Sequence, residues 1–122
     1  MIFIFLGLLL VFNSCCIGAK EDYLGNNMYL TEYDNVDRRI LYQTERCAVS
    51  GVEIVPMTIL EIANNDKWII AKSGNKRNNS NFKYWIIHNS YQDIPHAETV
   101  KKNTIGPLDY NNFKKILNEK AI

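Results

Sequence analysis

Residues 1–19 contain no charged side chain, and the first charge in the chain is Lys20. Over the whole chain, 14 lysines and arginines are almost balanced by 13 aspartates and glutamates. Binding to a nucleic acid backbone needs an excess of basic residues on one face, and this balance provides none. The sequence therefore predicts a protein without a nucleic acid partner.

Cysteine and catalytic motifs are also scarce. The three cysteines, Cys15, Cys16 and Cys47, do not stand at a spacing that is typical of a zinc site. The chain has no glycine-rich phosphate loop, and Ser50-Gly51 does not match the nucleophile elbow of hydrolases. We therefore predict no metal, no cofactor and no catalytic residue, and we favour a binding domain over an enzyme.

The apolar start of the chain ends in a lipobox-like junction, Val11-Phe12-Asn13-Ser14-Cys15. In bacterial lipoproteins a signal peptidase cuts before such a cysteine, and the thiol then carries the lipid. Ser14 is small enough for the position before the cut, although Phe12 is bulkier than the residue usual at its position. We predict a lipoprotein leader over residues 1–19, with Cys15 as the lipid attachment site and Cys16 as the alternative.

Three other interpretations of this leader remain open. An ordinary signal peptidase would cut after Ala19, with Ile17 and Ala19 at the recognition positions. An uncut leader would be a membrane anchor, since residues 1–19 approach the roughly 20 residues that a bilayer helix needs. In the third interpretation, the apolar segment is not a leader but a core strand of the domain. Signal peptides usually begin with a basic residue, so its absence here also allows a true start upstream of Met1.

The lipoprotein interpretation predicts a cellular address. We expect a protein of the bacterial cell envelope, held on the exported side of the membrane by its N-terminal lipid. Its partner would be an unidentified envelope protein or component. If Cys15 is lipidated, Cys16 and Cys47 can pair in an oxidising compartment. We nevertheless expect Cys47 to be an isolated thiol, because Cys16 would lie on a mobile tether.

Beyond the leader, the pattern predicts a polar tether over residues 20–27 and one domain over residues 28–122. Alternating and β-branched residues predict several strands, the first two of them joined as a hairpin. Their expected ranges are 28–33, 39–44, 52–55, 58–63, 67–72 and 82–88. The polar stretch 73–81 has no apolar residue and predicts an exposed, mobile loop.

The C-terminal part of the sequence predicts helices. Asp109 is a candidate N-cap, and Tyr110, Phe113, Ile116 and Leu117 share one helical face that would cover the sheet. Gly106-Pro107 predicts a stop before this helix, and a shorter helical turn is expected over residues 96–102. The expected class is α+β: an antiparallel meander of about five to six strands with a C-terminal helix packed on the sheet.

Two groups of side chains are candidates for chemistry. His88 and His96 have no cysteine or carboxylate at a metal-like spacing, so we interpret both as structural or surface residues. The carboxylates of the first hairpin are better explained by hydrogen bonding within turns. They are Glu32, Asp34, Asp37 and Glu45. A small envelope hydrolase or ligand-binding protein using these groups is the alternative function.

Aromatic residues are frequent in the predicted strands. We interpret them as core residues, although they would form a binding face if they were exposed. They are Tyr29, Tyr33, Tyr42, Trp68, Tyr84 and Trp85.

Three strings in order, Trp68-Ile69-Ile70-Ala71-Lys72, Tyr84-Trp85-Ile86-Ile87 and Gly106-Pro107-Leu108-Asp109-Tyr110 with Phe113, resemble a family of small uncharacterised bacterial lipoproteins, a domain of unknown function. The likeness covers about residues 52–117, together with the leader and its cysteine. It implies a compartment and an architecture, and it carries no activity.

Overall fold

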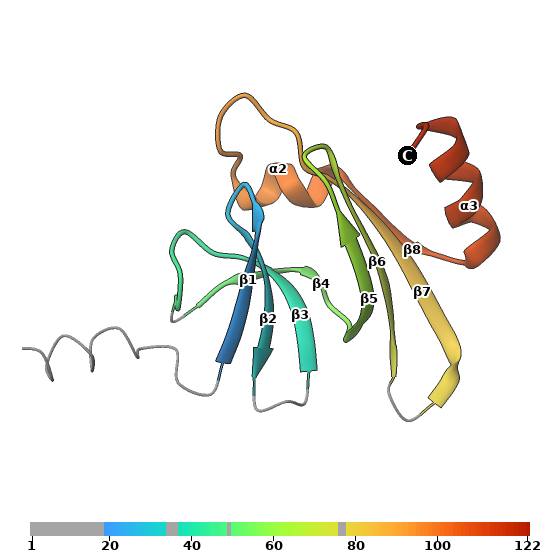
Figure 1. The fold of residues 1–122 in the computed structure, drawn as a ribbon, viewed down its shortest axis with the longest axis horizontal. Coiled ribbons are helices and arrows are strands. Elements are labelled where there is room, and N and C mark those ends of the chain that lie inside the picture. Colours follow the sequence, from blue (N-terminus) through green and yellow to red (C-terminus); the bar gives the residue numbers. More distant parts are fainter. Residues whose placement is uncertain (1–18, 34–36, 49, 76–77) are drawn as a thin grey trace, which may run out of the picture.

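The computed structural model describes residues 19–33, 37–48, 50–75 and 78–122. In these ranges the chain forms two sheets, each with four strands in sequential order. The first sheet contains β1 (Ala19–Gly25), β2 (Met28–Tyr33), β3 (Asp37–Tyr42) and β4 (Val52–Val55). The second contains β5 (Ile59–Asn64), β6 (Trp68–Asn75), β7 (Asn78–His88) and β8 (Thr104–Leu108). Figure 1 shows the two sheets side by side.

Every neighbouring strand pair is antiparallel, so each sheet is a meander. Two helices accompany the sheets in the described ranges, α2 (Ala97–Lys102) and α3 (Tyr110–Glu119). The predicted α+β class with an antiparallel meander and a C-terminal helix is therefore confirmed. The described residues form eight strands, which is more than we expected.

One apolar core joins the two sheets. Its buried residues come from β1 to β7, and α2 adds Val100 (Figure 1). Fully burying an aliphatic side chain of this size contributes about 1.5–3 kcal/mol, so these contacts dominate the stability of the domain. The core residues are Leu24, Met28, Leu30, Ile40, Ile54, Val55, Ile59, Ile69, Ala71, Trp85, Ile87 and Val100.

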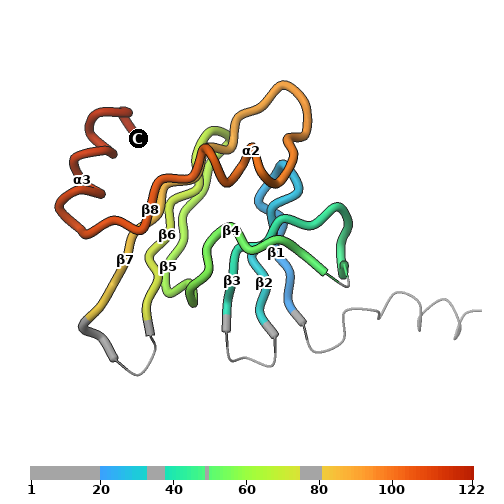
Figure 2. Tube along the Cα trace, turned by 180° about the vertical axis from the view of Figure 1, so that it is seen from behind, coloured from blue at the N-terminus to red at the C-terminus, as the bar shows by residue number. Residues whose placement is uncertain are grey.

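Helix α3 lies on the face of the second sheet that points away from this core (Figures 1 and 2). Alternation along β7 places Ile86 on the opposite face from Trp85 and Ile87, yet all three are buried. The sequence predicted that central strands are covered on both sides, and β7 confirms it. Asp109 is the N-cap of α3, as predicted, and its carboxylate accepts a hydrogen bond from the backbone N–H of Asn112 at 2.8 Å.

Residues 20–27 do not form the predicted tether. Most of this segment belongs to β1, which pairs with β2 and buries Glu21 and Leu24. The sequence Gly25-Asn26-Asn27 makes the tight turn between the two strands, and all three residues have positive φ. Glycine and asparagine tolerate that conformation better than other residues, so the composition that suggested a flexible spacer belongs to a hairpin.

Two further boundaries differ from expectation. The predicted exposed loop 73–81 is mostly strand, because β6 runs to Asn75 and β7 starts at Asn78, and both Ser73 and Gly74 are buried. The predicted stop at Gly106-Pro107 lies inside β8, which the sequence did not suggest. A proline is tolerated there because β8 is an edge strand, where one side needs no ladder partner.

Candidate functional site

Cys47 is disulfide-bonded. The expectation of an isolated thiol at this position is therefore wrong. The chain has two other cysteines, Cys15 and Cys16, and both lie outside the described residues, as does the rest of the predicted lipobox. None of the helices in the described ranges has the length and apolar character needed to span a bilayer.

A buried carboxylate holds the loop that carries Cys47. Glu21 on β1 is 9% exposed, and its Oε1 accepts a hydrogen bond from the backbone N–H of Cys47 at 2.8 Å. The side-chain amide of Gln43, which is 2% exposed, donates to Oε2 of Glu21 at 3.1 Å. Hydrogen bonds to an ionised carboxylate are stronger than neutral ones. We call Glu21, Gln43 and Cys47 the anchor clamp, because they fix the start of β1 to this loop.

The anchor clamp explains why the expectation of a free thiol at Cys47 was wrong. That expectation assumed a mobile chain after the two N-terminal cysteines. In the structure the chain is in β1 from Ala19 onward, and its Glu21 lies directly against Cys47. The start of β1 is therefore fixed beside Cys47.

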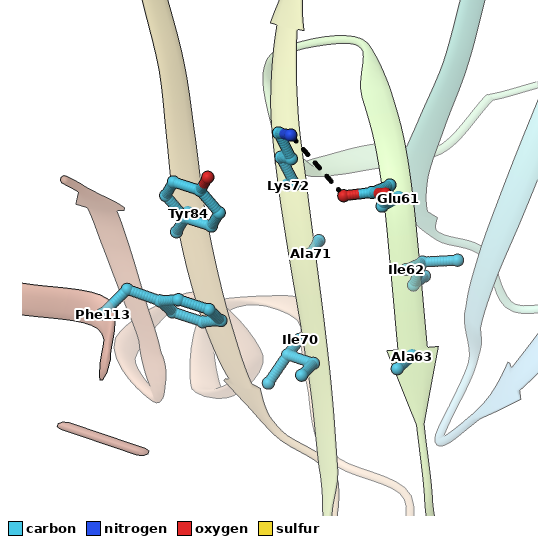
Figure 3. A pocket seen from close by; sticks show the side chains of 8 residues that line it. All are labelled: Glu61, Ile62, Ala63, Ile70, Ala71, Lys72, Tyr84 and Phe113. Carbon is cyan, nitrogen blue, oxygen red and sulfur yellow. Dashed lines mark ion pairs between the residues drawn. The ribbon is translucent and has the colours of Figure 1, made fainter. Parts of the chain in front are cut away.

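A second feature lies on the outer face of the second sheet. A pocket of about 170 Å³ opens between α3 and strands β5 and β6 (Figure 3). Its floor is apolar, and Phe113 projects from α3 toward Ile70 and Tyr84. The rings of Phe113 and Tyr84 stack with centroids 4.8 Å apart. At the other side, Lys72 Nζ and Glu61 Oε2 form an ion pair at 3.6 Å.

A smaller hollow of about 100 Å³ is also lined by Ala63 and Ile70, so the two hollows are neighbours on the sheet. Here the ring of Trp68 forms part of the wall, and Lys120 Nζ lies 5.4 Å from the centroid of that ring. We call the two hollows together the outer groove. Its residues are Glu61, Ile62, Ala63, Asn64, Asn65, Trp68, Ile70, Ala71, Lys72, Tyr84, Phe113 and Ile122.

A family model described as a protein of unknown function, DUF3997, matches residues 25–122. The chain belongs to the DUF3997 family. The match supports the resemblance to a domain of unknown function, and it includes every residue of the outer groove. Residues 1–24, which include Glu21, precede the matched range. Searches of curated proteins and of solved structures find no match to this chain.

Neither histidine of the DUF3997 domain lines the outer groove. The ring of His88 makes edge contacts with the rings of Trp68 and Tyr91, with centroids 5.2 and 5.0 Å apart. Its Nε2 is hydrogen-bonded to the backbone carbonyl of Ser90 at 2.7 Å. These contacts fit the structural role that we predicted for His88. His96 is exposed and precedes α2 without capping it through its side chain.

The carboxylates of the first hairpin do not converge on a described site. Glu32 is paired with Arg38 in the β2–β3 ladder, and Glu45 is exposed in the following loop. Asp34 and the side chain of Asp37 lie outside what the structure describes. In the described part of the DUF3997 domain, no three His, Cys, Asp or Glu side chains gather closely enough to hold a metal ion.

The aromatic residues divide between core and surface. Tyr29 and Trp85 are buried, as predicted, whereas Trp68 and Tyr84 line the outer groove. The side chain of Tyr33 lies outside the description. The sequence identified Phe113 as a residue that covers the sheet. It did not reveal that α3 leaves part of β5 and β6 uncovered, because that depends on where the helix lies across the sheet.

Proposed function

We propose that this DUF3997 protein is an exported, lipid-anchored protein of the bacterial envelope that binds another protein through its outer groove. The observation that carries the proposal is the disulfide at Cys47. Disulfides persist in oxidising compartments such as the periplasm or the cell surface, and they are rare in the cytosol. A disulfide therefore supports export, which is what the apolar leader predicts.

In this proposal the two adjacent cysteines have different roles. Cys15 completes the lipobox and takes the lipid, and Cys16 is the remaining partner for Cys47. Acyl chains contribute about 0.8 kcal/mol for each buried CH₂, and two or three chains hold a domain firmly where one does not. Because β1 begins at Ala19, the domain would sit directly at its anchor with no spacer between them.

The shape of the outer groove supports binding over catalysis. Sites for small molecules usually enclose roughly 300–1,000 Å³, whereas the pocket beside Phe113 holds about 170 Å³. Among the described residues that line this pocket, Glu61, Lys72 and Tyr84 are the ionisable ones, and Glu61 and Lys72 pair with each other. A shallow apolar depression of this kind is suited to contact with another protein.

Labelling with radioactive palmitate, combined with thiol alkylation, tests the division of roles. We expect Cys15→Ala to abolish the palmitate label while Cys47 stays protected from maleimide. We expect Cys16→Ala to keep the label and make Cys47 reactive toward maleimide. If Cys16→Ala abolishes the label and Cys15→Ala makes Cys47 reactive toward maleimide, the lipid is on Cys16.

Asn13→Ala in the same leader is a matched control that should change neither readout. A Cys15→Ala, Cys16→Ala double variant that still carries palmitate would overturn the lipid anchor. The interaction function is tested separately by crosslinking from the groove, as described below.

A further inference from the structure

We infer that the occupant of the outer groove is an extended, acidic segment of a partner protein, with apolar side chains over Ile70 and a carboxylate at Lys120. This inference rests on the proposed binding function and specifies the chemistry of the partner. Three properties of the groove carry it: its division into two shallow hollows, its open border, and the sign of its charge.

The two neighbouring hollows suit an extended chain. They adjoin at Ala63 and Ile70, and each has room for a side chain, not for a whole folded element. In an extended segment, alternate residues point to the same side, roughly 6–7 Å apart. Such a segment can place one apolar side chain beside Phe113 and the next beside Trp68.

The border of the groove is a sheet edge. β5 is the outermost strand of the second sheet, and its hydrogen-bonded neighbour in that sheet is β6. The start of this edge is covered by the first sheet, where the guanidinium of Arg38 on β3 donates to the carbonyls of Ile59 at 3.2 Å and Leu60 at 2.7 Å. Beyond that point Ala63 is small and exposed, so the groove is open toward the edge. An exposed strand edge beside apolar hollows is the arrangement that binds extended peptides.

The charge of this half of the protein favours an acidic occupant. Residues 58–122 contain ten lysines and arginines against six aspartates and glutamates, a formal charge of +4. Residues 20–57 contain four against seven, a formal charge of −3. The excess of positive charge therefore lies in the half that carries the groove. Complementary charge across an interface speeds association and selects the partner.

Two lysines, Lys72 and Lys120, lie in or beside the groove, and they differ in their partners. Lys72 at one end is already paired with Glu61. Lys120 does not line the groove but lies beside its smaller hollow, where it contacts the face of Trp68 and forms no ion pair with another described residue. Lys120 follows Phe113 by two helical turns, so both lie on the side of α3 that faces the groove. On the partner, an acidic side chain would then meet Lys120 and a nearby apolar side chain would meet Phe113.

Site-specific photocrosslinking in the native cell tests the inference on the full-length protein. The probe is benzoylphenylalanine incorporated at Asp66, an exposed position beside the groove residue Asn65 that does not itself line the groove, followed by sequencing of the crosslinked peptide. We expect an extended segment that alternates acidic and apolar residues. Lys120→Glu should reduce the crosslinking yield at least tenfold, and Lys101→Glu, an equal charge change on α2, should leave it within twofold.

Several outcomes would overturn the inference. A crosslinked segment that is neutral or basic, a crosslink to lipid, or a crosslink to a second copy of this chain would each reject the acidic partner and leave anchoring intact. Equal yields from Lys120→Glu and Lys101→Glu would also reject it. Absence of any crosslinked protein would reject the binding function itself, and palmitate labelling of the same cells would report separately on the anchor.

Discussion

Asn26 donates hydrogen bonds from its side-chain amide to both the backbone carbonyl and the side-chain oxygen of Asn89, each at 2.9 Å and across 63 residues of chain. Asn89 is 5% exposed, and its own amide donates to the backbone carbonyl of Leu24 at 2.8 Å. This pair of asparagines joins the β1–β2 turn of the first sheet to the end of β7 in the second.

Replacing the buried Asn89 should lower the free energy of unfolding of the domain more than a change at an exposed position does. Asn89→Ala removes the donor to the carbonyl of Leu24 and one of the two acceptors for the amide of Asn26, whose bond to the backbone carbonyl at position 89 remains. An unsatisfied buried polar group costs about 1–3 kcal/mol. Urea denaturation followed by circular dichroism would measure the loss. Ser90→Ala, at the exposed neighbouring position, should change the free energy of unfolding by less than about 0.5 kcal/mol. Equal effects of the two changes would contradict the prediction.

A second buried hydrogen bond links β6 to β7. Trp85 Nε1 donates to Ser73 Oγ at 2.8 Å, and Ser73 Oγ donates to the carbonyl of Lys83 at 3.3 Å. Ser73→Ala should lower the free energy of unfolding by about 1–3 kcal/mol, because the indole N–H then stays buried without an acceptor. Trp85→Phe removes that donor, so a double-mutant cycle should show a coupling of about 0.5–3 kcal/mol. Additive effects would show that the bond contributes nothing.

The N-cap of α3 offers a smaller and cleaner test. Asp109→Ala removes the acceptor for the backbone N–H of Asn112 and should destabilise the domain by about 1 kcal/mol. Asn111→Ala, at an exposed position in the first turn, is the matched control and should be near neutral. Thermal unfolding of both variants would check the difference. A loss as large for Asn111→Ala would point to the helix as a whole instead of its cap.

Reduction of the disulfide at Cys47 should weaken the domain without unfolding it. With Cys16 as the proposed partner the bond closes a loop of about thirty residues, and such a disulfide typically contributes about 2–4 kcal/mol. Dithiothreitol should lower the unfolding midpoint of the wild-type protein, by the amount that corresponds to this loss of free energy. Cys47→Ser should begin at the lower value and show no further response to the reductant. A response in the variant would mean that another bond carries the effect.

The strands that the sequence predicted best are Met28–Tyr33 and Val52–Val55, whose expected and observed ranges agree, and the apolar centres of Trp68–Asn75 and Asn78–His88 were also found. Hydrophobic burial dictates these strands locally, so the pattern is visible in one dimension. β8 was missed because Gly106-Pro107 is typical of a break. In the fold, a Cβ at position 106 would lie 2.5 Å from the ring of Trp85, so glycine is required by a neighbour that is distant in sequence.

The functional features were less predictable than the strands. Glu21 looked like one charge in a polar spacer, and only the return of the chain at Gln43 and Cys47 makes it a buried acceptor. The outer groove depends on the placement of a helix on a sheet, which no local pattern encodes. The leader, by contrast, is a linear motif, and its interpretation as a lipid anchor stays a prediction.

The sequential strand order of both sheets has a consequence for how the chain folds. Each strand pairs with its neighbour in sequence, so every ladder closes over a short stretch of chain. Topologies with such local pairing fold faster than those that must first bring distant segments together. A chain that emerges N-terminus first can complete all four strands of the first sheet before β5 has appeared. The shared core then forms last, when the second sheet docks against the first.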